Sequence, residues 1–212
     1  MGLVMTSLRI IGDVHGKFGR YREIIRNVPF SIQVGDMGVG FRNRMGEWTA
    51  NPPYAAMSQG RHLFLRGNHD NPEVCKRQRF WIPDGSVVDG IYCLGGAVSI
   101  DRAWRTEGFD WWMDEELSYA ELERMIDEYR AIKPDVVITH DCPASVADGI
   151  LAHFNMRKIE DGSRTRVALQ RMLDAHQPRE WYFGHWHQSV SFVLGGTAFR
   201  CMNELEFVDI DI

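Results

Sequence analysis

Five short apolar segments of this chain each end close to an aspartate, an asparagine or a histidine. The segments are residues 8–12, 30–34, 62–65, 136–139 and 181–183. Apolar runs of this length that stop at turn-forming residues are typical of buried β-strands. Helical patterns separate several of them, and strands that alternate with helices favour a mostly parallel sheet. The sequence therefore predicts an α/β fold.

The segments between these runs complete the expected secondary structure. Helical spacing is present over residues 17–28 and 163–175. Ser118 and Glu121 form a capping box for a further helix that should reach about residue 130. Additional short strands are expected at 86–88, 91–94 and 97–100, and in the tail 190–212 on both sides of Gly195-Gly196. Residues 37–60 and 101–117 should be largely irregular, and 141–161 show no clear pattern.

Composition limits the classes of protein that fit this chain. Its 212 residues, 44% of them hydrophobic, suit one globular domain over residues 1–212. The net charge of −5 does not favour stable binding to nucleic acid. The four cysteines form no C-x-x-C pair, which indicates a reducing, cytoplasmic setting. We expect neither a membrane span nor a signal peptide, because no apolar stretch approaches about 20 residues.

The polar residues that follow the five segments share one kind of chemistry. They are Asp13, His15, Asp36, Asn68, His69, Asp70, His140, Asp141, His185 and His187. In open α/β sheets the carboxyl ends of the strands form the ligand-binding edge, so these side chains should meet there. Carboxylate, imidazole and amide oxygen together suit divalent cations of intermediate hardness. The set is too large for one ion and suits two ions that share a carboxylate.

The same residues lie in motifs that resemble those of the calcineurin-like metallophosphoesterases. The motifs are GDVHG at 12–16, GD at 35–36, GNHD at 67–70, TH at 139–140 and GHWH at 184–187, in that family's order. The resemblance implies a four-layer αββα sandwich of two mixed β-sheets flanked by helices. Residues 35–40 read GDMGVG where the protein phosphatase branch has GDxVDRG. This departure and the closing GHWH favour the small phosphodiesterase-like branch.

The resemblance also implies a role for each motif residue. One metal ion would be held by Asp13, His15 and His187, and the other by Asn68, His140 and His185. Asp36 would bridge the two ions. His69 would assist the leaving group as an acid, with Asp70 orienting it, and a metal-bound hydroxide would attack the phosphorus. Mn²⁺ is the expected metal, with iron and Zn²⁺ as alternatives, because mixed oxygen and nitrogen ligands do not select sharply.

Several residues have a structural interpretation beside the functional one. Asp13 and Asp36 could be turn residues after their strands, and Asp141 fits a loop acceptor better than a ligand. Arg102, Arg105 and Trp111, in the irregular segment 101–117, could form either a substrate rim or an edge packed on the core. We assign these three to substrate binding as a hypothesis. Weaker candidates for a phosphate clamp are Arg42, Arg44 and Arg66.

The function predicted from these residues is metal-dependent hydrolysis of phosphoesters. The expected substrates are small nucleotides, with 2′,3′-cyclic nucleotides among the candidates, and both diesters and monoesters are compatible with the retained His69. The alternative enzyme is a serine/threonine phosphoprotein phosphatase, and a nuclease ranks third because of the acidic charge balance. An alternative of another class is a non-catalytic, metal-binding scaffold subunit. That alternative predicts lost ligands, and this chain has lost none.

Overall fold

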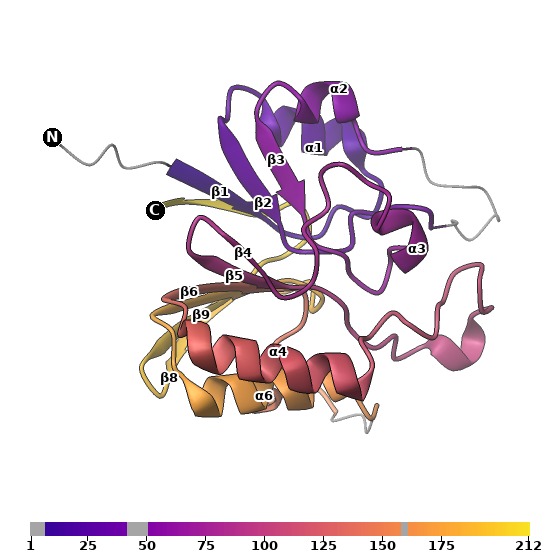
Figure 1. The fold of residues 1–212 in the computed structure, drawn as a ribbon. Coiled ribbons are helices and arrows are strands. Elements are labelled where there is room, and N and C mark those ends of the chain that lie inside the picture. The colour runs from indigo at the N-terminus through magenta and orange to yellow at the C-terminus, as the bar shows by residue number, and fades with distance from the viewer. Residues whose placement is uncertain (1–6, 42–50, 158–160) are drawn as a thin grey trace, which may run out of the picture.

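The computed structural model describes residues 7–41, 51–157 and 161–212, and these residues form two β-sheets (Figure 1). The first sheet has the order β10-β1-β2-β3. Its strands are β1 (Ser7–Ile11), β2 (Phe30–Gln33), β3 (Arg61–Phe64) and β10 (Phe207–Asp211). β1, β2 and β3 are parallel, whereas β10 pairs antiparallel with β1. The carboxyl ends of three consecutive parallel strands therefore meet at one edge.

The second sheet has the order β4-β5-β6-β7-β9-β8. Its strands are β4 (Ser86–Val88), β5 (Ile91–Leu94), β6 (Val136–Thr139), β7 (Glu180–Phe183), β8 (Val190–Leu194) and β9 (Thr197–Cys201). The four central strands are parallel, and β4 and β8 pair antiparallel at the two edges. The expected turn at Gly195-Gly196 is confirmed as the turn between β8 and β9.

Helices cover the outer face of each sheet. The first sheet packs against α1 (Phe18–Ile25), α2 (Tyr54–Met57) and α3 (Pro72–Cys75). The second packs against α4 (Tyr119–Ile132), α5 (Ala144–His153) and α6 (Arg164–Ala175). Figure 1 shows the resulting order of helices, sheet, sheet and helices, which confirms the expected four-layer αββα sandwich. No helix in the described part of the chain has the length and apolar character needed to cross a membrane.

The inner strands are apolar on both faces because each face is covered. In β6, Val136 and Ile138 pack between the two sheets, whereas Val137 packs against the helices. This alternation follows from the period of two in a strand. Burial on both faces also explains why these strands read as continuous apolar runs in the sequence.

Two segments differ from the sequence-based expectation. Residues 97–100 do not form a strand: they continue from β5 as a loop, in which the Ser99 N–H donates to the Glu115 carboxylate. Residues 141–161, which showed no pattern, contain α5. Segment 101–117 is irregular as expected, apart from the short 3₁₀ helix η1 (Arg102–Trp104). The capping box of Ser118 and Glu121 is confirmed at the start of α4.

Candidate metal centre

The polar ends of five strands meet between the carboxyl edges of the two sheets. From the first sheet, β1 leads to Asp13 and His15, β2 to Asp36 and β3 to Asn68. From the second, β6 leads to His140 and β7 leads to His185 and His187. All seven residues predicted as metal ligands therefore lie in one region, and they form two groups that share Asp36.

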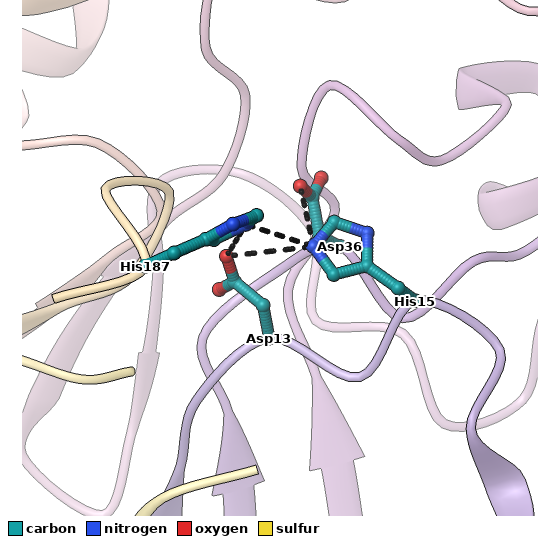
Figure 2. Close-up of side chains that lie close together, drawn as sticks. All are labelled: Asp13, His15, Asp36 and His187. Carbon is teal, nitrogen blue, oxygen red and sulfur yellow. Dashed lines mark hydrogen bonds and ion pairs between the residues drawn. The ribbon is translucent and has the colours of Figure 1, made fainter. Parts of the chain in front are cut away.

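The first group consists of Asp13, His15, Asp36 and His187 (Figure 2). The Nε2 atoms of His15 and His187 lie 2.9 Å apart. Oδ2 of Asp13 is 3.1 Å from His187 Nε2 and 3.9 Å from His15 Nε2. Asp36 Oδ2 completes the group at 3.7 Å from His15 Nε2. Two carboxylates and two imidazoles thus direct their ligand atoms at one small volume.

The second group consists of Asp36, His140 and His185, joined by Asn68. Asp36 Oδ1 is 3.3 Å from His140 Nε2. Asn68 Oδ1 lies 3.2 Å from His140 Nε2 and 2.9 Å from His185 Nδ1. Asp36 directs one carboxylate oxygen to each group, so this one side chain could serve a cation in either group.

Neighbouring groups orient these ligands. His140 Nδ1 lies 3.1 Å from the Val34 carbonyl, an acceptor, which places a proton on Nδ1 and leaves the Nε2 lone pair for a cation. Asp13 Oδ2 accepts from the His185 backbone N–H at 3.0 Å, and Asp36 Oδ1 accepts from the His69 N–H at 2.7 Å. The carboxylates are therefore fixed by the same loops that carry the histidines.

Four of the seven candidate ligands have a left-handed backbone conformation. The φ angles are 48° at His15, 56° at Asp36, 66° at His185 and 48° at His187. Residues with a Cβ rarely adopt this region, and each such position costs about 1–3 kcal/mol when the surroundings impose it. Strain that gathers at the ends of three separate strands indicates that side-chain placement, and not folding stability, determines these loops.

Two glycines allow the backbone to approach the ligands closely. A Cβ at position 67 would lie 2.1 Å from Asp36 Oδ1 and 2.6 Å from His140 Nε2. A Cβ at position 184 would lie 2.1 Å from Asp13 Oδ1. Neither distance is sterically tolerable, so only glycine fits at these positions while the carboxylates keep their places.

The electrostatics of the centre suit cations. Burial opposes ionisation of Asp36, but the imidazoles around it, His140 first, outweigh burial and hold its pKa well below the usual range. Burial also opposes the charge on His140, yet Asp36 and Asp13 raise its pKa to about 9. The hydrogen bond to Asp13 raises the pKa of His187. The ionised carboxylates thus attract positive charge, which divalent ions would supply in place of protons, and the donor set fits two such ions.

His69 lies beside the two groups and contacts Arg105. Its ring stacks on Phe41 with centroids 4.8 Å apart, and Arg105 Nη2 is 2.8 Å from its Nε2. Burial and the Arg105 cation lower the pKa of His69 to about 4, against the opposing effect of Asp36. In the structure, therefore, neutral His69 accepts a hydrogen bond from Arg105.

Asp70 has a different role from the one expected. Its carboxylate accepts four hydrogen bonds from backbone N–H groups, which are those of Met37, Gly38, Val39 and Gly67. Among the described residues, no contact joins this carboxylate to the His69 ring. The expectation that Asp70 orients His69 is wrong, because the loop after β2 presents three consecutive amides that occupy the carboxylate. Asp70 instead fixes the loop that follows the shared ligand Asp36.

Asp141 is a buried acceptor, as the sequence suggested. It accepts from the Cys142 N–H, from Arg166 Nε at 2.7 Å and from Trp186 Nε1 at 3.0 Å. Arg166 also lies over the Trp186 ring at 4.9 Å. Asp141 and Arg166 therefore hold the indole that stands between the two histidines of GHWH.

A pocket of about 410 Å³ opens beside the metal centre. Its lining combines the ligands Asp36, Asn68, His185 and His187 with His69, Arg105, Arg166, Trp186 and the apolar side chains Ile100, Leu151 and Met156. Of the residues assigned to substrate binding, only Arg105 reaches the pocket. Arg102 is exposed on η1 and contacts the Asp161 carbonyl, and Trp111 is half-buried elsewhere in the segment. Neither is among the described residues that line the pocket.

The weaker clamp candidates are not found at the pocket either. Arg66 is buried and pairs with Asp84 at 2.7 Å, and it donates to the backbone carbonyls of Asp114 and Glu115. Its interpretation as a phosphate ligand is wrong, because its donors are already used inside the fold. Arg42 and Arg44 lie outside the described residues.

Sequence reasoning missed Ser99, Glu115 and Phe41, which contact Asn68, Ser99 and His69 respectively. No motif signals them, because they come from irregular segments whose path only the folded chain defines. Trp186 could have been identified from the sequence, because it lies in the GHWH motif between the candidate ligands His185 and His187.

Comparisons with known proteins identify the family of this chain. The family model for calcineurin-like phosphoesterases matches residues 7–189. A Staphylococcus aureus protein named as a 5′-nucleotidase, solved with α-ketoglutarate, has a similar fold. It has a TM-score of 0.52 and 13% identity over 96% of this chain and 50% of its own. An uncharacterised Streptococcus pneumoniae protein, described as a predicted phosphoesterase, has a TM-score of 0.43 and 11% identity. The match covers 99% of this chain and 86% of that protein.

The anchor protein of the Plasmodium inner membrane complex has a TM-score of 0.47 and 11% identity, over 93% of this chain and 72% of its own. No curated relative matches in sequence. These structural likenesses concern the fold alone, whereas the family model covers most of the chain and includes every motif named above. The chain belongs to the calcineurin-like phosphoesterase family.

Proposed function

We propose that this protein hydrolyses small phosphoesters with two divalent metal ions, Mn²⁺ being the first candidate and iron or Zn²⁺ the alternatives. The observation that carries the proposal is the sharing of Asp36 between two groups of ligand atoms. Two ions held there would lower the pKa of a water molecule and polarise the phosphoryl oxygens. Asp13, His15 and His187 would hold one ion, and Asn68, His140 and His185 the other.

The residues beside the ligands would manage the substrate and its leaving group. Arg105 lies at the pocket with its guanidinium turned toward His69, and a bound phosphate would compete for the same donors. Phosphate binding to Arg105 would free His69 Nε2 and neutralise the cation that, after burial, lowers the pKa of His69. His69 could then take a proton and donate it to the departing oxygen.

The pocket supports small nucleotides as the substrate class, including 2′,3′-cyclic nucleotides. Trp186, held by Asp141 and Arg166, lines the pocket together with the apolar side chains of Ile100, Leu151 and Met156. A base could stack on the indole while the phosphate lies at the metal centre. A phosphoprotein phosphatase is less favoured, because residues 35–40 lack the Asp and Arg of that branch. Four buried, free cysteines support a reducing, cytoplasmic setting.

The test is hydrolysis of bis-p-nitrophenyl phosphate and p-nitrophenyl phosphate, followed by a panel of cyclic and linear nucleotides. The protein is stripped with chelator and reloaded with Mn²⁺, Fe²⁺, Zn²⁺ or Mg²⁺, and bound metal is measured for each sample. We expect two ions per chain and turnover that depends on them. Two bound ions without turnover of any substrate would favour the scaffold alternative, and failure to bind two ions would refute the dinuclear assignment.

A further inference from the structure

A buried chain of hydrogen bonds leads from Asn68 to a carboxylate outside every family motif. Asn68 Nδ2 donates to Ser99 Oγ at 3.1 Å. Ser99 Oγ donates to Glu115 Oε2 at 2.6 Å, and the Ser99 N–H donates to Glu115 Oε1 at 2.7 Å. The three residues are 3%, 1% and 3% exposed, so water does not compete with these bonds.

The direction of each bond in this chain is fixed by chemistry. An ionised carboxylate only accepts hydrogen bonds, so the single hydroxyl proton of Ser99 must point to Glu115. Ser99 Oγ can then only accept, and its partner must be the NH₂ group of Asn68. The amide oxygen is therefore forced to the opposite side, where it lies within 3.2 Å of His140 Nε2 and 2.9 Å of His185 Nδ1.

Glu115 is itself held firmly in place. The Arg66 guanidinium donates to the Asp114 and Glu115 carbonyls at 3.1 and 2.8 Å, and Arg66 pairs with buried Asp84. Segment 101–117 thus reaches the metal centre twice, through Glu115 toward Asn68 and through Arg105 toward His69.

We propose that Glu115, acting through Ser99, is a positioning residue that keeps the Asn68 oxygen turned toward the second group of metal ligands. This inference rests on the proposed function, because it takes Asn68 as a ligand. The charge of Glu115 is the decisive property. A neutral residue of the same shape at position 115 should reverse the direction of the hydrogen bonds between Asn68, Ser99 and residue 115.

Glu115→Gln removes the charge at position 115 without changing the size of the side chain, and it should therefore reverse these hydrogen bonds. The Ser99 N–H still requires an acceptor, so the Gln oxygen should stay there and its NH₂ group should face Ser99 Oγ. The hydroxyl proton is then free to donate to Asn68, which favours the flipped amide with NH₂ toward His140 and His185. Calorimetry and metal analysis should show two Mn²⁺ per chain in the wild type. In the variant the second ion should bind about 10- to 100-fold more weakly, while the first is retained.

Ser99→Ala separates polarity from packing. Without the hydroxyl nothing drives the flip, so Ser99→Ala should weaken the second ion less than Glu115→Gln does. The double variant should bind like Ser99→Ala alone. A double variant weaker than either single variant, or Glu115→Gln with two ions of wild-type affinity, would overturn the proposal.

A measurement on the metal-free protein keeps the two proposals distinguishable. By NMR, the side-chain amide protons of Asn68 should show nuclear Overhauser contacts to Ser99 in the wild type, and to His140 or His185 in Glu115→Gln. Wild-type protein that binds fewer than two ions would refute the dinuclear function, yet these contacts would still decide the orientation. Contacts to Ser99 in both proteins would refute the role of Glu115.

Discussion

A side chain at position 67 would collide with the shared ligand of the metal centre. The Cβ of Gly67→Ala would lie 2.1 Å from Asp36 Oδ1, and Asp36 cannot retreat because its other oxygen faces the first group. We expect the variant to fold but to bind both ions at least about tenfold more weakly, with turnover falling accordingly. Gly19→Ala is the matched control, since its Cβ would meet nothing within 4 Å. Two tightly bound ions in Gly67→Ala would contradict the close contact between residue 67 and the Asp36 carboxylate.

Asp36 is also the residue whose charge both groups share. Asp36→Asn keeps the shape but removes the negative charge that attracts cations to either side. We expect turnover to be abolished and bound metal to fall at both positions, measured by metal analysis after dialysis. Near-normal rates would refute the bridging assignment.

His69 should contribute to the chemistry without holding metal. His69→Ala removes the ring that lies between Arg105 and the centre, yet it leaves all seven assigned ligands in place. We expect the variant to bind two ions. Its loss of turnover should be larger for phosphate monoesters with leaving groups poorer than p-nitrophenolate than for activated diesters. Poor leaving groups depend most on a proton donor, so an equal loss on both classes would count against the acid role.

The gathering of the candidate ligands was predictable from residue types, whereas the contacts that support them were not. Asp13 and Asn68 follow apolar runs of the first sheet and His140 follows one of the second, and parallel strands bring such ends to one edge of each sheet. Ser99 and Glu115 belong to irregular segments, so their meeting depends on the path of two loops. The resemblance led to the wrong contact for Asp70, because its partners are backbone amides that no residue pattern reveals.

At the scale of elements, most strands and the capped helices α4 and α6 followed from pattern, whereas α5 and one buried loop did not. Residues 97–100 contain Ala97 and Val98, both fully buried, and so imitate a short strand. Within the described part of the chain no strand pairs with this segment; the Glu115 carboxylate and the Asn68 side chain bond to its Ser99. Apolar residues indicate that a segment is buried. A buried segment need not be a strand when a side chain accepts the hydrogen bond of its backbone N–H group.

The capping box of α4 gives a testable element-scale consequence. Ser118 Oγ accepts from the Glu121 N–H, and the Glu121 carboxylate accepts from the Ser118 N–H at 2.9 Å. Ser118→Ala should lower the free energy of unfolding by about 1 kcal/mol. Urea denaturation of the metal-free protein would measure this, and Ser118→Thr should recover most of the loss. Because α4 packs on the outer face of the second sheet, metal binding should be unchanged.

At the scale of the whole molecule, the metal centre connects the two sheets. Asp13, Asp36 and Asn68 follow strands of the first sheet, and His140 and His185 follow strands of the second. Ions held by candidate ligands from both sheets would bind only the assembled sandwich, so they should stabilise the fold as a whole. A free-ion concentration of about 100 times Kd would add about 2.7 kcal/mol per independent site.

That stabilisation should depend on pH in a defined direction. Burial opposes the charge on His140, but Asp36 and Asp13 raise its pKa from 6.5 to about 9 in the metal-free protein. Its protonation therefore stabilises that form fully below about pH 6.5, and the contribution is lost as the pH rises through about 9. A metal ion requires the deprotonated Nε2, so its affinity should rise over the same range.

At a fixed Mn²⁺ concentration, thermal unfolding should accordingly show a larger gain in Tm near pH 8 than near pH 6.5, relative to chelator-treated protein at each pH. The matched control is His62→Gln, because His62 is buried away from the ligands and pairs with Ser31 at 2.8 Å. That variant should keep the pH dependence of the gain, whereas His140→Gln should lose most of the gain at both values. An equal gain at the two pH values in the wild type would show that protons and ions do not compete for His140, and would remove it from the ligand set.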